Sequence, residues 1–314
     1  MKAAVYEGQH TLNLHECKPR SPGSHEVRLE IAYCGICGSD LHILEGTEDK
    51  RMHLPSIIGH ECSAVVAEIG KDVANLSVGD HVVVTPVKAC GHCNACKSGF
   101  SHVCENLQVR GIEVEGAFQY SWTVDADAVI KIPDSLSLKH AALAEPLSIC
   151  CHVVKRGNVK TDDFVVVIGG LEKAHNLGID AINPMEIDIK QYVMKKTHGV
   201  GADVVFETSG SQAGVDVMVE LPKVRGRIVL VAIYGRPMVV NLKQMYYFEK
   251  EMITARMQEL EDFEKAIELL TQKAFDPEGI ITSVLPLTSI HEGFKRCSNR
   301  NGSEVKVIID CHIN

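Results

Sequence analysis

The sequence has no apolar run that approaches the roughly 20 residues needed to cross a bilayer, so we expect no membrane partner. Its start, MKAAVYEGQH, lacks the apolar segment of a secretory signal, and we therefore expect a cytoplasmic protein. Basic residues are fewer than acidic ones: the chain has 32 Lys and Arg and 41 Asp and Glu, which gives a net charge of −9. Such a chain does not attract nucleic acid. With 45% hydrophobic and 23% charged residues, disorder, collagen and coiled coil are excluded as dominant structures.

Cysteine, in contrast, is abundant: the 314 residues include 12 cysteines. In a reducing compartment, metal binding or catalysis explains cysteines better than disulfides do. Four of them, Cys90, Cys93, Cys96 and Cys104, stand close together in CGHCNACKSGFSHVC. Four thiolates at this spacing can surround one tetrahedral Zn²⁺ and leave no position open for substrate. The sequence therefore predicts a structural zinc site, with an iron–sulfur cluster as the rival interpretation.

The pattern of apolar residues changes along the chain. Short β-branched or alternating runs such as VRLEIAY and ECSAVVAEIG dominate the first part. After about residue 160, strands such as DFVVVIGG, ADVVFETSG, RIVLVAIYG and the shorter DAIN alternate with helical stretches such as KQYVMKKTHG and VDVMVELPKVRG. DFVVVIGG is typical of a strand buried on both faces. We predict an α/β protein of two domains, a β-rich one over 1–152 and 285–314 and a parallel α/β one over 153–284.

A second group of metal-binding residue types lies in three separate segments. GICGSDLH offers Cys37 and His42, GHE offers His60 and Glu61, and LAEPL offers Glu145. A catalytic zinc has three protein ligands and an open position for water or substrate. Each residue alone is weak evidence, since a lone Cys is more often a small buried hydrophobe.

In their combination and order, CGICGSDLH, GHE, VGDHVVV, the four-cysteine run and AEPL resemble the zinc-containing medium-chain alcohol dehydrogenase superfamily, in its polyol (sorbitol-type) and threonine dehydrogenase branch. The resemblance implies a GroES-like catalytic domain followed by a Rossmann-type domain. It also implies the roles of the candidate residues: Cys37 and His60 as catalytic zinc ligands, Glu61 as a catalytic residue and a ligand that can come and go, Glu145 on the metal directly or through water, Ser39 and His42 as a proton relay, and Asp40 as the carboxylate that orients His60. Where this chain has Glu145, the simple alcohol branch has a second Cys.

The Rossmann-type domain is incomplete at its first βαβ unit. A full dinucleotide fingerprint reads G-x-G-x-x-G, followed by a helix and an acidic second strand. Here Gly169 and Gly170 lead at once into LEKAHNLGIDAIN, and the glycine turn, the first helix and the second strand are missing. Either the protein lacks this unit, which would abolish or weaken dinucleotide binding, or the sequence omits a segment. We favour an omission, because loss of an inner strand should disrupt a buried parallel sheet.

The remaining pieces, GVGADVVFETSG and GRIVLVAIYG, keep the register of the family. By resemblance, the cofactor-binding residues are Gly169, Gly170, Glu207, Gly210 and Ile233, with NAD and NADP both open. The expected function is zinc-dependent hydride transfer between a nicotinamide cofactor and a polyol or other secondary alcohol, sorbitol-like, butanediol-like or threonine. The alternative is a zinc-stabilised homologue that binds no dinucleotide and serves as a non-catalytic binding module. The family resemblance also implies a homodimer or homotetramer.

Overall fold

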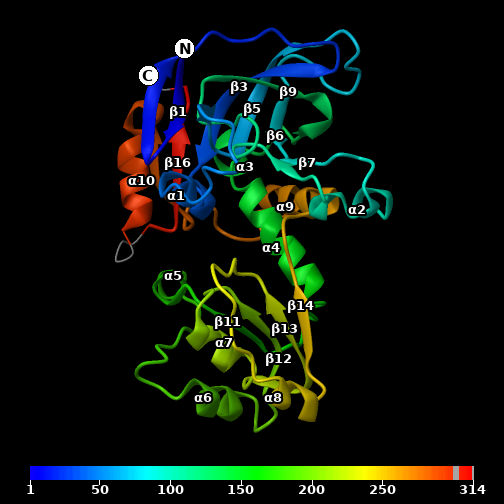
Figure 1. Ribbon diagram of the computed structural model, residues 1–314, viewed down its shortest axis with the longest axis vertical. Coiled ribbons are helices and arrows are strands. Elements are labelled where there is room, and N and C mark those ends of the chain that lie inside the picture. The colour runs from blue at the N-terminus through cyan, green and yellow to red at the C-terminus, as the bar shows by residue number, and fades with distance from the viewer. Residues whose placement is uncertain (300–303, 313–314) are drawn as a thin grey trace. The chain divides into compact units, whose positions relative to one another are not determined.

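The computed structural model describes residues 1–299 and 304–312, which form two compact units (Figure 1). The first unit comprises Met1–Ile149 and Gln258–Asn314, and the second comprises Cys150–Met257. Among the described helices, none is long and apolar enough to span a membrane.

The first unit is built on one large β-sheet with the strand order β10-β6-β5-β3-β16-β15, in which β9 also pairs with β3. Its strands are β3 (Glu26–Gly35), β5 (Glu61–Ile69), β6 (His81–Val84), β9 (Ser121–Asp125), β10 (Val129–Lys131), β15 (Ile281–Pro286) and β16 (Lys306–Asp310). Two smaller sheets have the orders β2-β1-β4 and β7-β8. Their strands are β1 (Lys2–Gly8), β2 (Thr11–Glu16), β4 (Ser56–Ile57), β7 (Val87–Lys88) and β8 (Gln108–Val109).

Alternation of apolar and polar residues explains how these strands bury one face. In β3, Val27, Leu29 and Ile31 are completely buried, as the alternating run VRLEIAY predicts. The α-helices of this unit are α1 (Gly38–Leu44), α2 (Asn94–Lys97), α3 (Leu138–Ala141), α9 (Leu260–Thr271) and α10 (Ile290–Ser298), and the 3-10 helices are Ser101–Val103, Ala126–Ala128 and Leu287–Ser289.

The helix α9 packs into the core of the first unit. Its residues Phe263, Ile267 and Leu270 lie in one buried cluster with Val83 of β6 and Ile308 of β16. The sequence pattern predicts this stretch within a second domain over 153–284, whereas the structure groups the residues from Gln258 onwards with the first unit.

The second unit is a parallel sheet with the order β11-β12-β13-β14. Its strands are β11 (Val165–Ile168), β12 (Ala202–Glu207), β13 (Pro222–Leu230) and β14 (Glu251–Thr254). Its helices are α5 (Leu171–Asn176), α6 (Ile189–Lys196), α7 (Gln212–Met218) and α8 (Leu242–Tyr247), while α4 (Ala144–Arg156) begins in the first unit and ends in the second. Apolar residues of β12, α7 and β13 form the core, among them Val205, Val215 and Ile228.

Three local predictions for this unit are wrong. The strand β11 is not buried on both faces: Val165 is 38% exposed and Val167 59% exposed, so the face that these two side chains share is not covered. Within the described residues, β11 is also an edge strand that pairs with β12 alone. Residues 180–183 (DAIN) form no strand. Residues 222–226 (PKVRG) belong to β13 rather than to a helix. Pro222 is the first residue of this strand, a position where proline is tolerated although it has no N–H to donate to the sheet.

The order of the strands in this sheet never reverses along the chain. Dinucleotides bind to such sheets outside the carboxyl ends of the strands, in the crevice where the strand order reverses. The first strand, β11, is therefore an edge strand here, and the chain passes from Gly170 directly into α5. The structure thus shows the incomplete first βαβ unit that the sequence indicated.

Candidate active site

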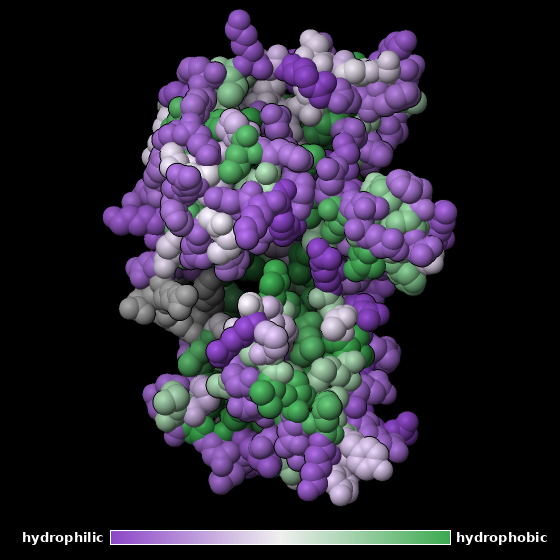
Figure 2. Space-filling model, in the orientation of Figure 1, coloured by the Kyte–Doolittle hydropathy of each residue, from purple (hydrophilic) through white to green (hydrophobic). Residues whose placement is uncertain are grey.

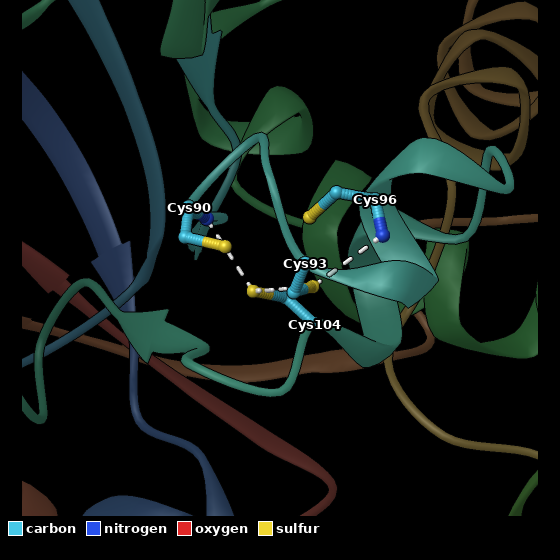
Figure 3. Close-up of side chains that lie close together, drawn as sticks. All are labelled: Cys90, Cys93, Cys96 and Cys104. Carbon is cyan, nitrogen blue, oxygen red and sulfur yellow. Dashed lines mark hydrogen bonds between the residues drawn. The ribbon is translucent and has the colours of Figure 1, made fainter.

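Four cysteines of the loop after β7 converge on one point (Figure 3). The Sγ atoms of Cys90, Cys93, Cys96 and Cys104 all lie within 4.8 Å of one another, and those of Cys93 and Cys104 are 3.7 Å apart. A tetrahedral zinc with Zn–S bonds of about 2.3 Å requires sulfur atoms roughly 3.8 Å apart. The short helix α2 helps to place them, because the N–H of Cys96 points at Cys93 Sγ.

The protonation of this quartet fits a bound cation. Backbone N–H groups of His92 and Cys93 outweigh burial and lower the pKa of Cys90 to about 6. At Cys104 the N–H of Cys90 favours the thiolate, but burial and the neighbouring thiols Cys90 and Cys96 raise the pKa to about 11. Four adjacent thiolates repel one another unless a cation lies between them. The quartet is a structural zinc site, and its four ligands leave no open position.

A second cluster lies where β3 ends and β5 begins. Ligand atoms of Cys37, His60 and Glu61 lie within 4.8 Å of one another. The two strands bring them together because β3 and β5 are antiparallel, with Gly35 opposite Glu61. Gly35 is required there, since a Cβ atom would clash with the Glu61 carboxylate.

Asp40 organises this cluster from the first turn of α1. Its Oδ2 accepts the N–H of Cys37 at 2.9 Å, and its Oδ1 lies 3.7 Å from Nδ1 of His60. Asp40 Oδ1 and His60 Nδ1 are buried and have no hydrogen-bond partner in the described part of the chain. A metal on Nε2 would fix the tautomer in which Nδ1–H donates toward Asp40.

The electrostatics around His60 favour positive charge. Burial lowers the pKa of His60, but the carboxylate of Asp40 and the thiol of Cys37 raise it well above its usual value. A pocket that stabilises an imidazolium in this way also stabilises a metal cation in its place. The chemistry of the donors, one thiol, one imidazole and a carboxylate, suits Zn²⁺.

Glu61 is held by a lysine that sequence reasoning missed. Nζ of Lys306, in β16, lies 2.7 Å from both carboxylate oxygens of Glu61, and it also donates to the carbonyl of Ile36 at 3.3 Å. Burial disfavours the charged ammonium, but Glu61 and Cys37 hold the pKa of Lys306 above its ordinary value. A lysine within the apolar run EVKVIIDC was the available signal.

Glu145 lies outside the cluster of Cys37, His60 and Glu61, although it interacts electrostatically with it. It is 6% exposed, and its Oε1 accepts the side-chain amide of Gln258 at 3.1 Å. Burial and the charge of Glu61 raise the pKa of Glu145 to about 7, against the opposing influence of His60. No sequence signal pointed to Gln258.

The two predicted relay residues lie on α1 in different surroundings. Ser39 Oγ is 3.4 Å from His60 Nε2, so its hydroxyl reaches the cluster. The His42 side chain is 57% exposed, and its Nδ1 lies 3.4 Å from the carboxylate of Glu45. Ser39 therefore contacts the cluster itself, whereas His42 contacts solvent.

The predicted cofactor residues come together at one edge of the second unit's sheet. Gly169 and Gly170 follow β11, Glu207 ends β12 and Gly210 follows it, and Ile233 follows β13. We call these carboxyl ends of β11, β12 and β13 the candidate cofactor edge. Hydrogen bonds join its loops: the backbone N–H and the hydroxyl of Thr208 both donate to the carbonyl of Ile168, at 3.0 and 2.9 Å.

Comparison with known proteins agrees with this architecture. Residues 23–134 match the alcohol dehydrogenase GroES-like domain, and residues 165–272 match the zinc-binding dehydrogenase family. The 2-dehydro-3-deoxy-L-galactonate 5-dehydrogenase of Pseudoalteromonas atlantica is 39% identical over 339 aligned positions, which cover 99% of each chain. The sorbitol dehydrogenase of Halalkalibacterium halodurans is 28% identical over 343 positions, 98% of this chain and 99% of the relative.

Among solved structures, a short-chain alcohol dehydrogenase from E. coli CFT073 complexed with NADH has a TM-score of 0.91 and 27% identity, with 99% of each chain covered. The alignments with the two sequence relatives are longer than the 314 residues of this chain, so both relatives contain residues that it lacks.

The fold and the two cysteine-containing clusters define a zinc-binding dehydrogenase with a GroES-like domain and a parallel α/β domain. The chain belongs to the zinc-containing medium-chain alcohol dehydrogenase superfamily and is an NAD(P)-dependent oxidoreductase of CH–OH donors. The predicted family, two-domain fold and enzyme class are confirmed. The individual roles of Cys37, His60, Glu61, Glu145, Ser39 and His42 stay predictions.

Proposed function

We propose that this enzyme transfers hydride between NAD(P) and a secondary hydroxyl of a polyhydroxylated substrate, a sugar acid or a polyol. The observation that carries the proposal is the cluster of Cys37, His60 and Glu61, with the buried carboxyl of Glu145 close enough to interact with it electrostatically. The names of the relatives support this substrate class: one is a dehydrogenase of a deoxy sugar acid, and another is a sorbitol dehydrogenase.

Each residue of the cluster has a distinct task in this proposal. Zinc, when bound, acts as a Lewis acid that lowers the pKa of the substrate hydroxyl, and the nicotinamide supplies the hydride acceptor. Cys37 and His60 would hold the metal, and Asp40 would orient His60. Ser39 would receive the hydroxyl proton, and the exposed His42 would release it to solvent.

The oligomeric state is part of the proposal as well. The second unit exposes many large apolar side chains, including Val239 at 78% and Leu242 at 68%. Hydrophobic residues gather on the visible face of this unit (Figure 2). Apolar surface of this extent favours association, and a homodimer or homotetramer in the cytoplasm accounts for it.

The test is an absorbance assay of NADH or NADPH formation by the purified, zinc-loaded protein, with NAD⁺ and NADP⁺ supplied in turn. We expect turnover of sorbitol or a 3-deoxy sugar acid with kcat/KM about tenfold above that for 2,3-butanediol and L-threonine, because buried polar groups reject substrates that leave them unpaired. A folded, zinc-loaded protein that oxidises none of these alcohols would contradict the proposal and would favour the non-catalytic binding module.

A further inference from the structure

The carboxylate of Glu207 ties together two loops of the candidate cofactor edge. Glu207 is completely buried at the end of β12. Its Oε1 accepts the N–H and the hydroxyl of Ser209, at 2.9 and 2.5 Å. Its Oε2 accepts the N–H of Gly210 at 3.3 Å and the hydroxyl of Tyr234 at 2.5 Å. Three donors therefore come from the loop after β12, and the fourth comes from the loop after β13.

The sequence predicts Glu207 as a cofactor-binding residue, but these hydrogen bonds give it a structural role between two loops. A carboxylate with no exposed surface and four donors has no acceptor free for a cofactor. The pKa of Tyr234 is raised, first by burial and then by its bond to Glu207, so the phenol stays the donor at neutral pH. Glu207 and Tyr234 thus form a fixed donor–acceptor pair between two loops.

The loops after β12 and β13 pack closely against each other and against α7. A Cβ atom at Gly214, in the first turns of α7, would lie 2.6 Å from Glu207 Oε1 and would clash with Ser209 Oγ. A Cβ atom at Gly210, whose φ is +62°, would lie 3.3 Å from the carbonyl oxygen of Ile233. The absence of side chains at both glycines lets α7 and the loop after β13 approach the Glu207 carboxylate.

The position of the pair relates it to cofactor binding. In open parallel sheets, nucleotide ligands bind at the carboxyl ends of the strands, which here are the ends that Glu207 joins. Ile233, directly before Tyr234, is 90% exposed at this edge. A loop that presents an apolar residue to a ligand must be ordered, or binding has to supply the ordering free energy.

We propose that Tyr234 is a positioning residue for the nicotinamide cofactor, acting through Glu207 to hold residues 231–235 against residues 208–211. The inference rests on the proposed dehydrogenase function. Without the Tyr234 hydroxyl, Glu207 keeps its bonds to Ser209 and Gly210. The loop after β13 then loses its side-chain link to the buried carboxylate, while the fold of the sheet is unaffected.

The test compares Tyr234→Phe with Tyr246→Phe, a matched control at an 80% exposed tyrosine of the same unit. The first measurement is hydrogen exchange of the cofactor-free protein. We expect the amides of residues 233–235 to exchange about tenfold faster in Tyr234→Phe and at the wild-type rate in Tyr246→Phe, since one hydrogen bond to a charged acceptor is lost. The amides of Ser209 and Gly210 keep their bonds to the Glu207 carboxylate, and those of Val231 and Ala232 keep theirs to the Glu207 carbonyl, so these four should exchange at the wild-type rate in both variants. Unchanged exchange in Tyr234→Phe would overturn the inference, whatever the enzyme binds.

The second measurement is steady-state kinetics with NAD⁺ and a substrate found in the panel above. We expect the KM for NAD⁺ to rise about tenfold in Tyr234→Phe while kcat stays within about twofold, because cofactor binding must then order the loop. A KM for NAD⁺ within about twofold of wild type would overturn the positioning role. A fall in kcat together with a fall in the thermal midpoint would overturn it too, because the substitution would then have destabilised the whole enzyme. A wild-type protein without turnover of either NAD⁺ or NADP⁺ would instead contradict the proposed function, and the exchange measurement would still decide whether Tyr234 holds the loop.

Discussion

The ammonium group of Lys306 lies 2.7 Å from both carboxylate oxygens of Glu61, although 245 residues separate them in the sequence. The Glu61 side chain is 1% exposed and that of Lys306 is 14% exposed, so solvent screens this ion pair little. Because Glu61 also belongs to the cluster with Cys37 and His60, the lysine competes with any metal for the carboxylate. Lys306 occupies one acceptor position on each oxygen of Glu61, so a metal at Glu61 would share the carboxylate with the ammonium group.

Removing this lysine should therefore destabilise the first unit. We expect Lys306→Met to lower the free energy of unfolding by about 3 kcal/mol, because it leaves a buried carboxylate without its partner. Lys306→Arg keeps the charge and should therefore lose less than Lys306→Met, although the guanidinium is larger and differs in shape from the ammonium group. Urea unfolding measures both values, and an equal loss in the two variants would show that side-chain shape, rather than charge, matters at this position.

The two cysteine clusters should respond differently to mutation. Cys37→Ala should reduce kcat/KM by about a thousandfold or more, since the Lewis acid contributes several kcal/mol to the transition state. The thermal midpoint should hardly change. Cys90→Ala should instead lower the thermal midpoint, because three thiolates no longer enclose the structural zinc.

Metal analysis and calorimetry of the two variants check this contrast. Each variant should lose one zinc per chain, from a different site. Cys17→Ala is the control, since Cys17 is a half-buried free cysteine outside both clusters. Full activity in Cys37→Ala would contradict the assignment of the catalytic site.

The sequence predicted those parts of the site that depend on local spacing. Cys90, Cys93 and Cys96 are tethered within seven residues, so their convergence requires no knowledge of the rest of the fold. That Cys37 and His60 act at one site was implied by the resemblance to a family, and nothing in the periodicity predicted the pairing of β3 with β5 that brings them together. The lysine within the apolar run EVKVIIDC was a visible signal, but its partner could not be predicted, because only the pairing of β16 with β3 places Lys306 beside Glu61.

In the second unit, the composition of a strand predicted its burial incorrectly. The run VVVI has the composition of an inner strand, but its burial depends on which strands and helices pack around it, and the run itself does not determine these. No helix of the missing first βαβ unit covers the face that Val165 and Val167 share, so both side chains are exposed. Tyr234 was missed for a similar reason, because its contact with Glu207 depends on β12 and β13 being adjacent in the sheet.

Glu26 should make the stability of the first unit depend on acid pH. Its hydrogen bonds with Arg20 and with the N–H of Gly23 lower its pKa from 4.5 to about 2. The stabilisation is therefore complete above about pH 4.5 and is lost as the pH falls toward 2. Because the Arg20 side chain is 60% exposed, screening reduces the contribution to about 1 kcal/mol.

Unfolding at pH 6 and at pH 3 measures this contribution. Wild type should lose about 1 kcal/mol more than Glu26→Gln between the two values, and Arg20→Gln should show the same reduced loss. Equal losses in wild type and both variants would show that the bidentate pair does not persist in solution.

The mass of the purified protein decides between the two explanations of the incomplete βαβ unit. The exposed valines of β11 have the character of an inner strand, which favours an omitted segment. We therefore expect an intact mass about 3 kDa above the 34.4 kDa of the sequence, since a βαβ unit takes roughly 30 residues. A mass of 34.4 kDa would show that the deletion is real. NAD⁺ affinity would then depend on the loops that Glu207 joins, because no second strand would be present to bind the adenosine ribose.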